Sequence, residues 1–82
     1  MRLEIEFTKS ALKDLKSLPR DIQERVIGVL LRIRSNPYRY SKKLAGTDFY
    51  KVRVGDYRII NWISDKIYVL KIAHRKKIYR YF

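Results

Sequence analysis

Hydrophobic and polar residues alternate from Met1 to Phe7. Leu3, Ile5 and Phe7 fall on one face of an extended chain, and charged residues fall on the other. This period of two is typical of a strand with one buried face. The chain is therefore predicted to begin with a half-buried β-strand.

Apolar residues then recur at helical spacing in two stretches. Thr8 or Ser10 is expected to cap the first helix and Pro19 to end it. The second helix is expected to begin near Arg20 or Asp21 and to end at Asn36-Pro37. Its stripe is wide and predicts the more buried helix of the two: Ile22, Val26, Val29, Leu30 and Ile33, widened by Ile27 and Leu31. The short connection predicts an antiparallel helix pair.

The stretch from Phe49 to Ile60 has the pattern of a β-hairpin, since β-branched and aromatic residues flank Gly55-Asp56. A two-residue turn there places Arg53 opposite Arg58, with Lys51 on the same face. Like charges directly opposite repel each other, so a bound anion would stabilise the pair. A solvated face is the simpler interpretation of each residue alone. The three together, on a strongly basic chain, favour a phosphate site.

Residues 38–48 are predicted to form an irregular link whose basic and aromatic side chains either contact a nucleic-acid strand or anchor a surface loop. Beyond it, Ile67 to Ala73 is nearly all apolar, which predicts an interior strand. The length of the turn before this strand is not fixed by the sequence, so His74 can lie on either face of the sheet. A two-residue loop places Ala73 opposite Arg58 and His74 on the other face, whereas a three-residue loop places His74 on the Arg58 face.

The predicted fold class is α+β: an N-terminal strand, a two-helix hairpin, then a three-stranded antiparallel meander, forming one small sheet with the helices packed on it. The chain has 82 residues and no internal repeat. A single domain spanning residues 1–82 is expected, because this length supports one small core.

Composition narrows the classes of partner. Lys and Arg number 20 against 8 Asp and Glu, and the net charge is +12. This excess favours a polyanion, nucleic acid above all, or an acidic protein. The sequence has no membrane-spanning run and no secretory signal, so we expect a cytoplasmic protein without a membrane partner. The lack of Cys and the single His predict no disulfide, no metal site and no small-molecule cofactor.

Three segments carry a resemblance to a known family: Leu44-Ala45-Gly46, Tyr50 to Ile60, and Ala73 to Tyr79. With the predicted order of elements, the whole chain resembles the RelE/ParE toxin superfamily. The resemblance implies the toxin of a type II toxin–antitoxin pair, and the charge suggests an acidic antitoxin as its partner. RelE-like members enter the ribosomal A site and cut messenger RNA without a metal, by attack of the 2′-hydroxyl on the adjacent phosphate. ParE-like members poison DNA gyrase instead. That activity, or a non-catalytic basic RNA-binding domain, is the alternative.

The resemblance implies roles for the three hairpin residues. Lys51 matches a candidate general base. Arg53 matches a position that neutralises phosphate charge. Arg58 matches the arginine that stabilises the charged transition state, and planar Arg suits phosphate contact.

The tail adds three further candidates. Arg75 matches a tail arginine of the superfamily, and Tyr79 matches a tyrosine that stacks on a base. His74 is a second candidate for the general base, because many relatives place a catalytic histidine in this region and His is the side chain most often used for proton transfer. A strand-end histidine bonded locally is the other interpretation of His74.

Overall fold

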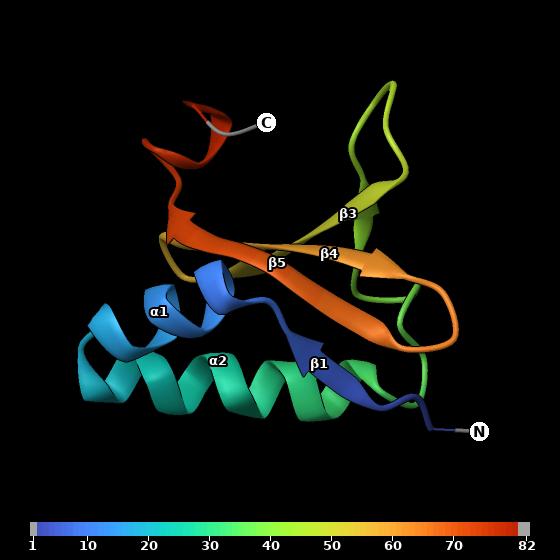
Figure 1. The fold of residues 1–82 in the computed structure, drawn as a ribbon, viewed down its shortest axis with the longest axis horizontal. Coiled ribbons are helices and arrows are strands. Elements are labelled where there is room, and N and C mark those ends of the chain that lie inside the picture. The colour runs from blue at the N-terminus through green and yellow to red at the C-terminus, as the bar shows by residue number, and fades with distance from the viewer. Residues whose placement is uncertain (1, 81–82) are drawn as a thin grey trace.

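The computed structural model describes residues 2–80, which form two helices, a five-stranded sheet and a short 3-10 helix (Figure 1). The strand order is β1-β5-β4-β3-β2. Both α-helices lie on one side of the sheet and the 3-10 helix lies on the other (Figure 1). The elements are β1 (Ile5–Phe7), α1 (Lys9–Ser17), α2 (Arg20–Ile33), β2 (Lys42–Lys43), β3 (Phe49–Val54), β4 (Tyr57–Ile63), β5 (Ile67–His74) and η1 (Ile78–Arg80).

The α+β class and the two helices match the prediction, but the sheet is larger than predicted. β3, β4 and β5 pair antiparallel in chain order, as expected of a meander. β1 joins this sheet parallel to β5, so the sheet is mixed. β2 forms inside the link that was predicted to be irregular, where Lys42 pairs with Lys51 and Lys43 with Tyr50. A strand of two residues shows no alternation, so its sequence could not reveal it.

Both helices begin where their flanking residues predict, but α2 ends at Ile33, before the expected Asn36-Pro37. Thr8 caps α1, since its Oγ1 accepts a hydrogen bond from the backbone N–H of Ala11 at 3.1 Å. Pro19 separates α1 from α2. The buried face of α2 packs in the core with the inner face of the sheet, through Val26, Leu30, Ile33, Val52, Ile59 and Val69. No helix within residues 2–80 has the length and apolar character needed to cross a bilayer.

The predicted burial of the wider stripe of α2 is wrong. Ile27 is 39% exposed and Leu31 is 56% exposed. The reason is geometric, because the core lies against one side of α2 only, and no element of the described chain covers the opposite side.

The β3–β4 hairpin has the predicted register. Val54 pairs with Tyr57, and Arg53 pairs with Arg58. Gly55 has a φ of +57°, whereas Asp56 does not have a positive φ, a combination that matches a type II′ turn. A Cβ at Gly55 would also lie 3.3 Å from both Nη atoms of Arg25 on α2. The turn therefore favours glycine for its backbone angle, and a larger residue would also make the flexible Arg25 side chain shift.

The β4–β5 pair combines features of both expected registers. Its loop has three residues, since Ile63 pairs with Ile67, and this alone would place His74 on the Arg58 face. Leu70 then bulges out of the pairing, because Asn61 pairs with Val69 but the next pair joins Ile60 to Lys71. A bulge shifts the alternation by one residue. As a result, Ala73 lies opposite Arg58 and His74 lies opposite Tyr57, on the helix side.

Candidate functional site

The outer face of the sheet, away from the helices, carries the basic residues of the hairpin. Val52 and Val54 are buried in the core, so Lys51 and Arg53 point to the other side. Arg58 lies opposite Arg53, on the same outer face. The structure thus brings together the three hairpin residues that were predicted to bind phosphate.

Two basic residues of β5 and the tail have a carboxylate neighbour. Lys71 forms an ion pair with Asp14 at 3.1 Å, and the Nε of Arg75 lies 3.8 Å from a carboxylate oxygen of Asp56. Within the described part of the chain, no carboxylate forms an ion pair with the three hairpin cations, Lys51, Arg53 and Arg58.

Arg58 is held at the turn end of the outer face. Its Nη1 donates hydrogen bonds to the carbonyl oxygens of Gly55 and Tyr57, both at 2.9 Å. These two carbonyl dipoles offset part of the repulsion between Arg58 and Arg53. The paired arginines are therefore compatible with the folded chain alone, while Arg53 remains exposed to solvent.

Tyr79 of η1 reaches Lys51 across the outer face. The Nζ of Lys51 donates a hydrogen bond to the phenol oxygen at 2.8 Å, and it lies 5.5 Å from the centre of the ring. Taken together, these distances place the ammonium beyond the phenol oxygen and near the ring plane. The contact is therefore a hydrogen bond and not a cation–π interaction, which needs the cation over the ring face.

The hydrogen bond from Lys51 lowers the pKa of Tyr79 below its ordinary value. The positive charges of Lys51, Arg58 and Lys42 act in the same direction, while partial burial opposes them. Tyr68 shows the contrary case, because burial and its hydrogen bond to Asp65 raise its pKa. The outer face thus favours the ionised form of one particular phenol.

The other two tail candidates lie apart from this cluster. Arg75 sits beside the hairpin turn, where its backbone N–H donates to the carbonyl of Asp56 at 2.7 Å. His74 faces the helix side and packs against the ring of Tyr57, with centroids 5.6 Å apart. Its Nδ1 accepts a hydrogen bond from the backbone N–H of Lys76 at 3.2 Å. The structure does not bring His74 to the face that carries Lys51.

A family model described as the ParE toxin of type II toxin–antitoxin systems, parDE, matches residues 5–79. The chain belongs to the RelE/ParE toxin superfamily. It is 34% identical over 87 residues to Toxin RelE3 of Methanocaldococcus jannaschii, an alignment covering 98% of this chain and 99% of that one.

Two solved structures of toxin–antitoxin complexes share the fold of this superfamily member. The RelBE2 complex of Mycobacterium tuberculosis matches with a TM-score of 0.84 and 27% identity, over 92% of this chain and 100% of the other. The RelB–RelE complex of Methanococcus jannaschii matches with a TM-score of 0.77 and 32% identity, over 94% and 98% of the two chains.

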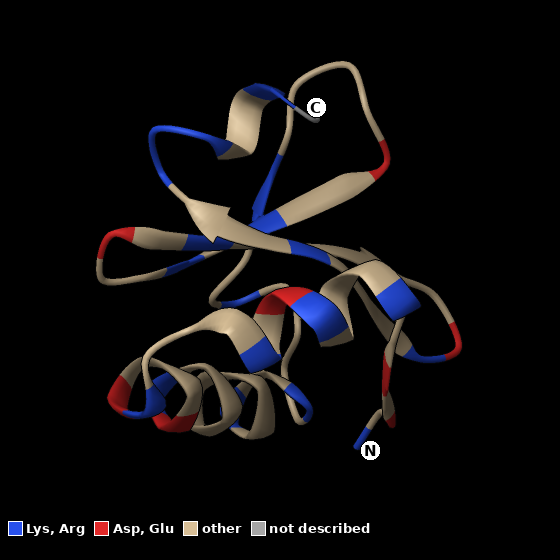
Figure 2. Ribbon diagram, turned by 60° about the vertical axis from the view of Figure 1, so that its left-hand side comes forward, with Lys and Arg blue, Asp and Glu red and all other residues tan. Residues whose placement is uncertain are grey.

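Lys42 is a neighbour of the cluster that the sequence did not single out as a site residue. It lies directly opposite Lys51 across β2 and β3, and its charge contributes to the lowered pKa of Tyr79. Lys and Arg are spread over helices as well as strands (Figure 2), so the density of positive charge does not mark the site. The pairing of Lys42 with Lys51 in the sheet, which the sequence does not reveal, is what places Lys42 beside the cluster.

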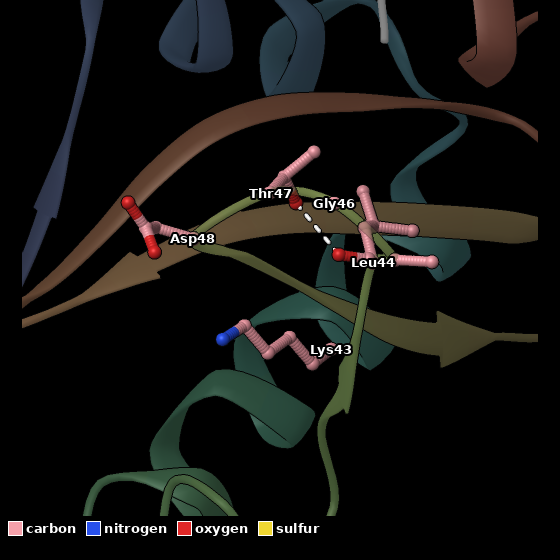
Figure 3. A pocket seen from close by; sticks show the side chains of 6 residues that line it. Lys43, Leu44, Gly46, Thr47 and Asp48 are labelled. Atoms are coloured by element: carbon pink, nitrogen blue, oxygen red, sulfur yellow. Dashed lines mark hydrogen bonds between the residues drawn. The ribbon is translucent and has the colours of Figure 1, made fainter.

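The hollow beside the β2–β3 loop contains none of the predicted site residues (Figure 3). Its lining is the loop itself, residues 43–48, in which the hydroxyl of Thr47 donates to the carbonyl of Leu44 at 2.9 Å. Lys43, which lines it, alternates with Lys42 and so points away from the outer face. In residues 2–80, no three His, Asp or Glu side chains gather as metal ligands would. The candidate cluster therefore lies on the open outer face and not in this hollow.

Replacement of Lys51 by Met should raise the pKa of Tyr79 back toward its ordinary value. The variant removes the donor that most strongly favours the ionised phenol. The measurement is a titration of the tyrosine ring carbons by ¹³C NMR, with the Tyr79 signal assigned from Tyr79→Phe. Lys43→Met is the matched control, since it removes a lysine that points away from the outer face. An equal pKa of Tyr79 in Lys51→Met and in the wild type would contradict the hydrogen bond between Lys51 and Tyr79.

Proposed function

We propose that this chain is a RelE-like toxin that cuts messenger RNA in the ribosomal A site, by metal-independent attack of a ribose 2′-hydroxyl on the adjacent phosphate. The observation that carries the proposal is the convergence of Lys51, Arg53 and Arg58 on one open face, with Tyr79 bonded to Lys51. An open face suits a strand presented by a large partner better than a small free substrate.

In the proposed reaction, a bond forms between the 2′-oxygen and phosphorus, and the bond from phosphorus to the 5′-oxygen breaks. One proton leaves the 2′-hydroxyl and one is delivered to the 5′-oxygen. The products are a cyclic phosphate and a 5′-hydroxyl. Negative charge gathers on the phosphate oxygens in the transition state, and Arg53 and Arg58 are the groups that stabilise it.

Lys51 in its neutral form is the proposed proton acceptor, and the phenol oxygen of Tyr79 is the group that first takes the proton of the charged lysine. Their 2.8 Å hydrogen bond and the lowered pKa of Tyr79 both favour such exchange. Because the two groups are bonded, their protonation states depend on one another. His74 receives no part in this transfer, since its side chain lies on the helix side of the sheet.

Tyr79 has a second proposed role as a stacking surface for a base of the message. Its side chain is 57% exposed, and Lys51 occupies the edge of the ring and leaves its face uncovered. Stacking of a base on an aromatic ring is worth roughly 1–3 kcal/mol. This would orient the nucleotide whose phosphate lies against the arginines.

Inhibition of DNA gyrase is the alternative, because the matching family model is named for ParE toxins. Binding to gyrase requires a surface that fits a protein and has no need of converging phosphate-binding groups. The cluster on the outer face therefore favours cleavage of RNA over gyrase binding, and over simple RNA binding without chemistry.

Arg58→Ala should fold yet cut messenger RNA about 10²–10³-fold more slowly, since that is the usual loss when one group that stabilises transition-state charge is removed. The measurement is the rate of cleavage in a purified translation system at saturating ribosomes. Arg32→Ala is the matched control, because it removes the same charge from the exposed side of α2.

Two further readouts separate the alternatives in this experiment. Thermal unfolding shows whether the lost hydrogen bonds to Gly55 and Tyr57 impair folding. A supercoiling assay with purified gyrase tests the ParE-like activity. Undiminished cleavage by Arg58→Ala would reject the assigned role, and gyrase inhibition without any cleavage by the wild type would reject the proposed function.

Tyr79→Phe and Tyr79→Ala separate the two roles given to this residue. If stacking dominates, Phe keeps most of the cleavage rate, whereas Ala loses the ~1–3 kcal/mol of base contact. If proton exchange with Lys51 dominates, Phe is as slow as Ala, because both lack the hydroxyl. Single-turnover cleavage rates across pH decide between them, and full activity of Tyr79→Ala would contradict both roles.

We further propose that an acidic antitoxin holds this chain inactive. Two of its structural relatives are complexes of a toxin with its antitoxin. The net charge of +12 opposes compactness of the free chain through self-repulsion, and an acidic partner relieves that repulsion. The exposed Ile27 and Leu31 of α2 offer apolar surface for such a partner to cover.

Co-expression with the neighbouring open reading frame should yield a complex that melts well above the free chain, because binding to the folded state raises apparent stability. A tag on one protein and measurement of melting temperature after purification test this. Expression of this chain alone should arrest growth. Recovery of the chain without a partner, together with normal growth, would contradict both the antitoxin and the toxin assignment.

A further inference from the structure

His74 lies where the chain leaves β5 and turns toward the outer face. It is the last residue of β5, and its ring packs edge-on against Tyr57 on the helix side. Only Arg75, Lys76 and Lys77 separate it from η1, which carries Tyr79 to Lys51. His74 is thus remote from the phosphate-binding face but close in the chain to the residue that completes it.

The link from β5 to η1 is exposed, so its course depends on its own hydrogen bonds. The backbone N–H of Arg75 donates to Asp56, at 2.7 Å. The next N–H, of Lys76, donates to Nδ1 of His74 at 3.2 Å, and that of Lys77 donates to the carbonyl of His74 at 2.8 Å. Two of the three amides of the link are therefore bonded to one residue.

The bond from the Lys76 amide to the His74 ring has a recognisable form. A side-chain atom that accepts from the backbone N–H two residues on is the arrangement that Asn and Asp make in Asx turns. Nδ1 of histidine and Oδ1 of asparagine are separated from the backbone by the same number of bonds. Because Nδ1 accepts here, the neutral ring carries its proton on Nε2.

The conformation of the link sets the positions of two residues in η1, Ile78 and Tyr79. Ile78 is fully buried, and the adjacent Tyr79 directs its hydroxyl to Lys51. A change in the direction of so short a link would move both residues. We propose that His74 is a positioning residue: through Nδ1 it holds the Arg75–Lys77 link in the conformation that brings the Tyr79 hydroxyl to Lys51. Its effect on cleavage rests on the proposed function, whereas its effect on Tyr79 does not.

Two substitutions separate the acceptor from the ring. His74→Asn keeps an acceptor at the position of Nδ1 and loses the ring contact with Tyr57. His74→Phe keeps an aromatic ring against Tyr57 and loses the acceptor. If His74 positions Tyr79, the Phe variant shifts the NMR titration of Tyr79 upward, toward its course in Lys51→Met, while the Asn variant titrates like the wild type. If His74 acts only by packing against Tyr57, the Asn variant shifts the titration of Tyr79 and the Phe variant titrates like the wild type.

Cleavage provides the second readout. His74→Phe should cut more slowly by up to ~10²-fold, the loss that follows from misplacing a group by about 1 Å, and His74→Asn should restore most of the rate. A general base would instead lose ~10²–10⁴-fold in both variants, with the titration of Tyr79 unchanged. That result, or an unshifted Tyr79 in the Phe variant, would overturn the proposal.

Hydrogen exchange of the wild type tests the same bond without a substitution that could impair folding. The Lys76 amide should be protected from exchange because it donates to His74, although it is exposed to solvent. An unprotected Lys76 amide would overturn the proposal. Neither NMR measurement needs the ribosome, so a wild type that cuts no RNA would reject the proposed function and leave the result for His74 intact.

Discussion

The outer face of this protein depends on the register of the β3–β4 hairpin. Side chains alternate along a strand, so a slip of one residue would exchange the two faces of β3. The turn at Gly55 opposes that slip, because its positive φ favours glycine at this one position. Burial of Val52 and Val54 then directs Lys51 and Arg53 outward together.

The bulge at Leu70 is the second constraint, because it determines which side chains at the end of β5 lie on each face of the sheet. It places the small side chain of Ala73 opposite Arg58 and sends His74 to the helix side. The outer face thereby keeps its basic residues next to a small side chain. The histidine is placed instead at the start of the link that carries Tyr79.

An ion pair and a hydrogen bond of Asp14 tie one end of β5 to the first helix. Asp14 of α1 accepts from the backbone N–H of Ile72 and pairs with Lys71, so it joins α1 to the part of β5 beyond the end of β1. The cluster built from Lys51, Arg53 and Arg58 has no comparable carboxylate in the described chain. Several other cations, such as Lys76 and Lys77, also lack an ion pair within residues 2–80. The proposal that RNA phosphate binds the cluster therefore rests on the convergence of its three cations on one face.

The amino-acid sequence by itself determined the features that depend on near neighbours in the chain. The Thr8 cap, the break at Pro19 and the hairpin around Gly55-Asp56 each follow from a few adjacent residues. The opposition of Arg53 and Arg58 follows from that turn. Recognition of the superfamily rested on the same local motifs, and the family comparison supports it.

Tertiary structure alone decided the features that depend on packing between distant segments. The pairing of β2 with β3, the exposure of Leu31 and the bulge at Leu70 each arise from which surface meets which. The face of His74 shows the reason most clearly. Loop length alone would have placed His74 on the same face as Arg58, but the bulge shifts the alternation of β5 by one residue. No pattern within the sequence of β5 predicts this bulge. Likewise, the contact between Tyr79 and Lys51 joins residues 28 positions apart, so it depends on how the chain turns after β5 and not on either local sequence.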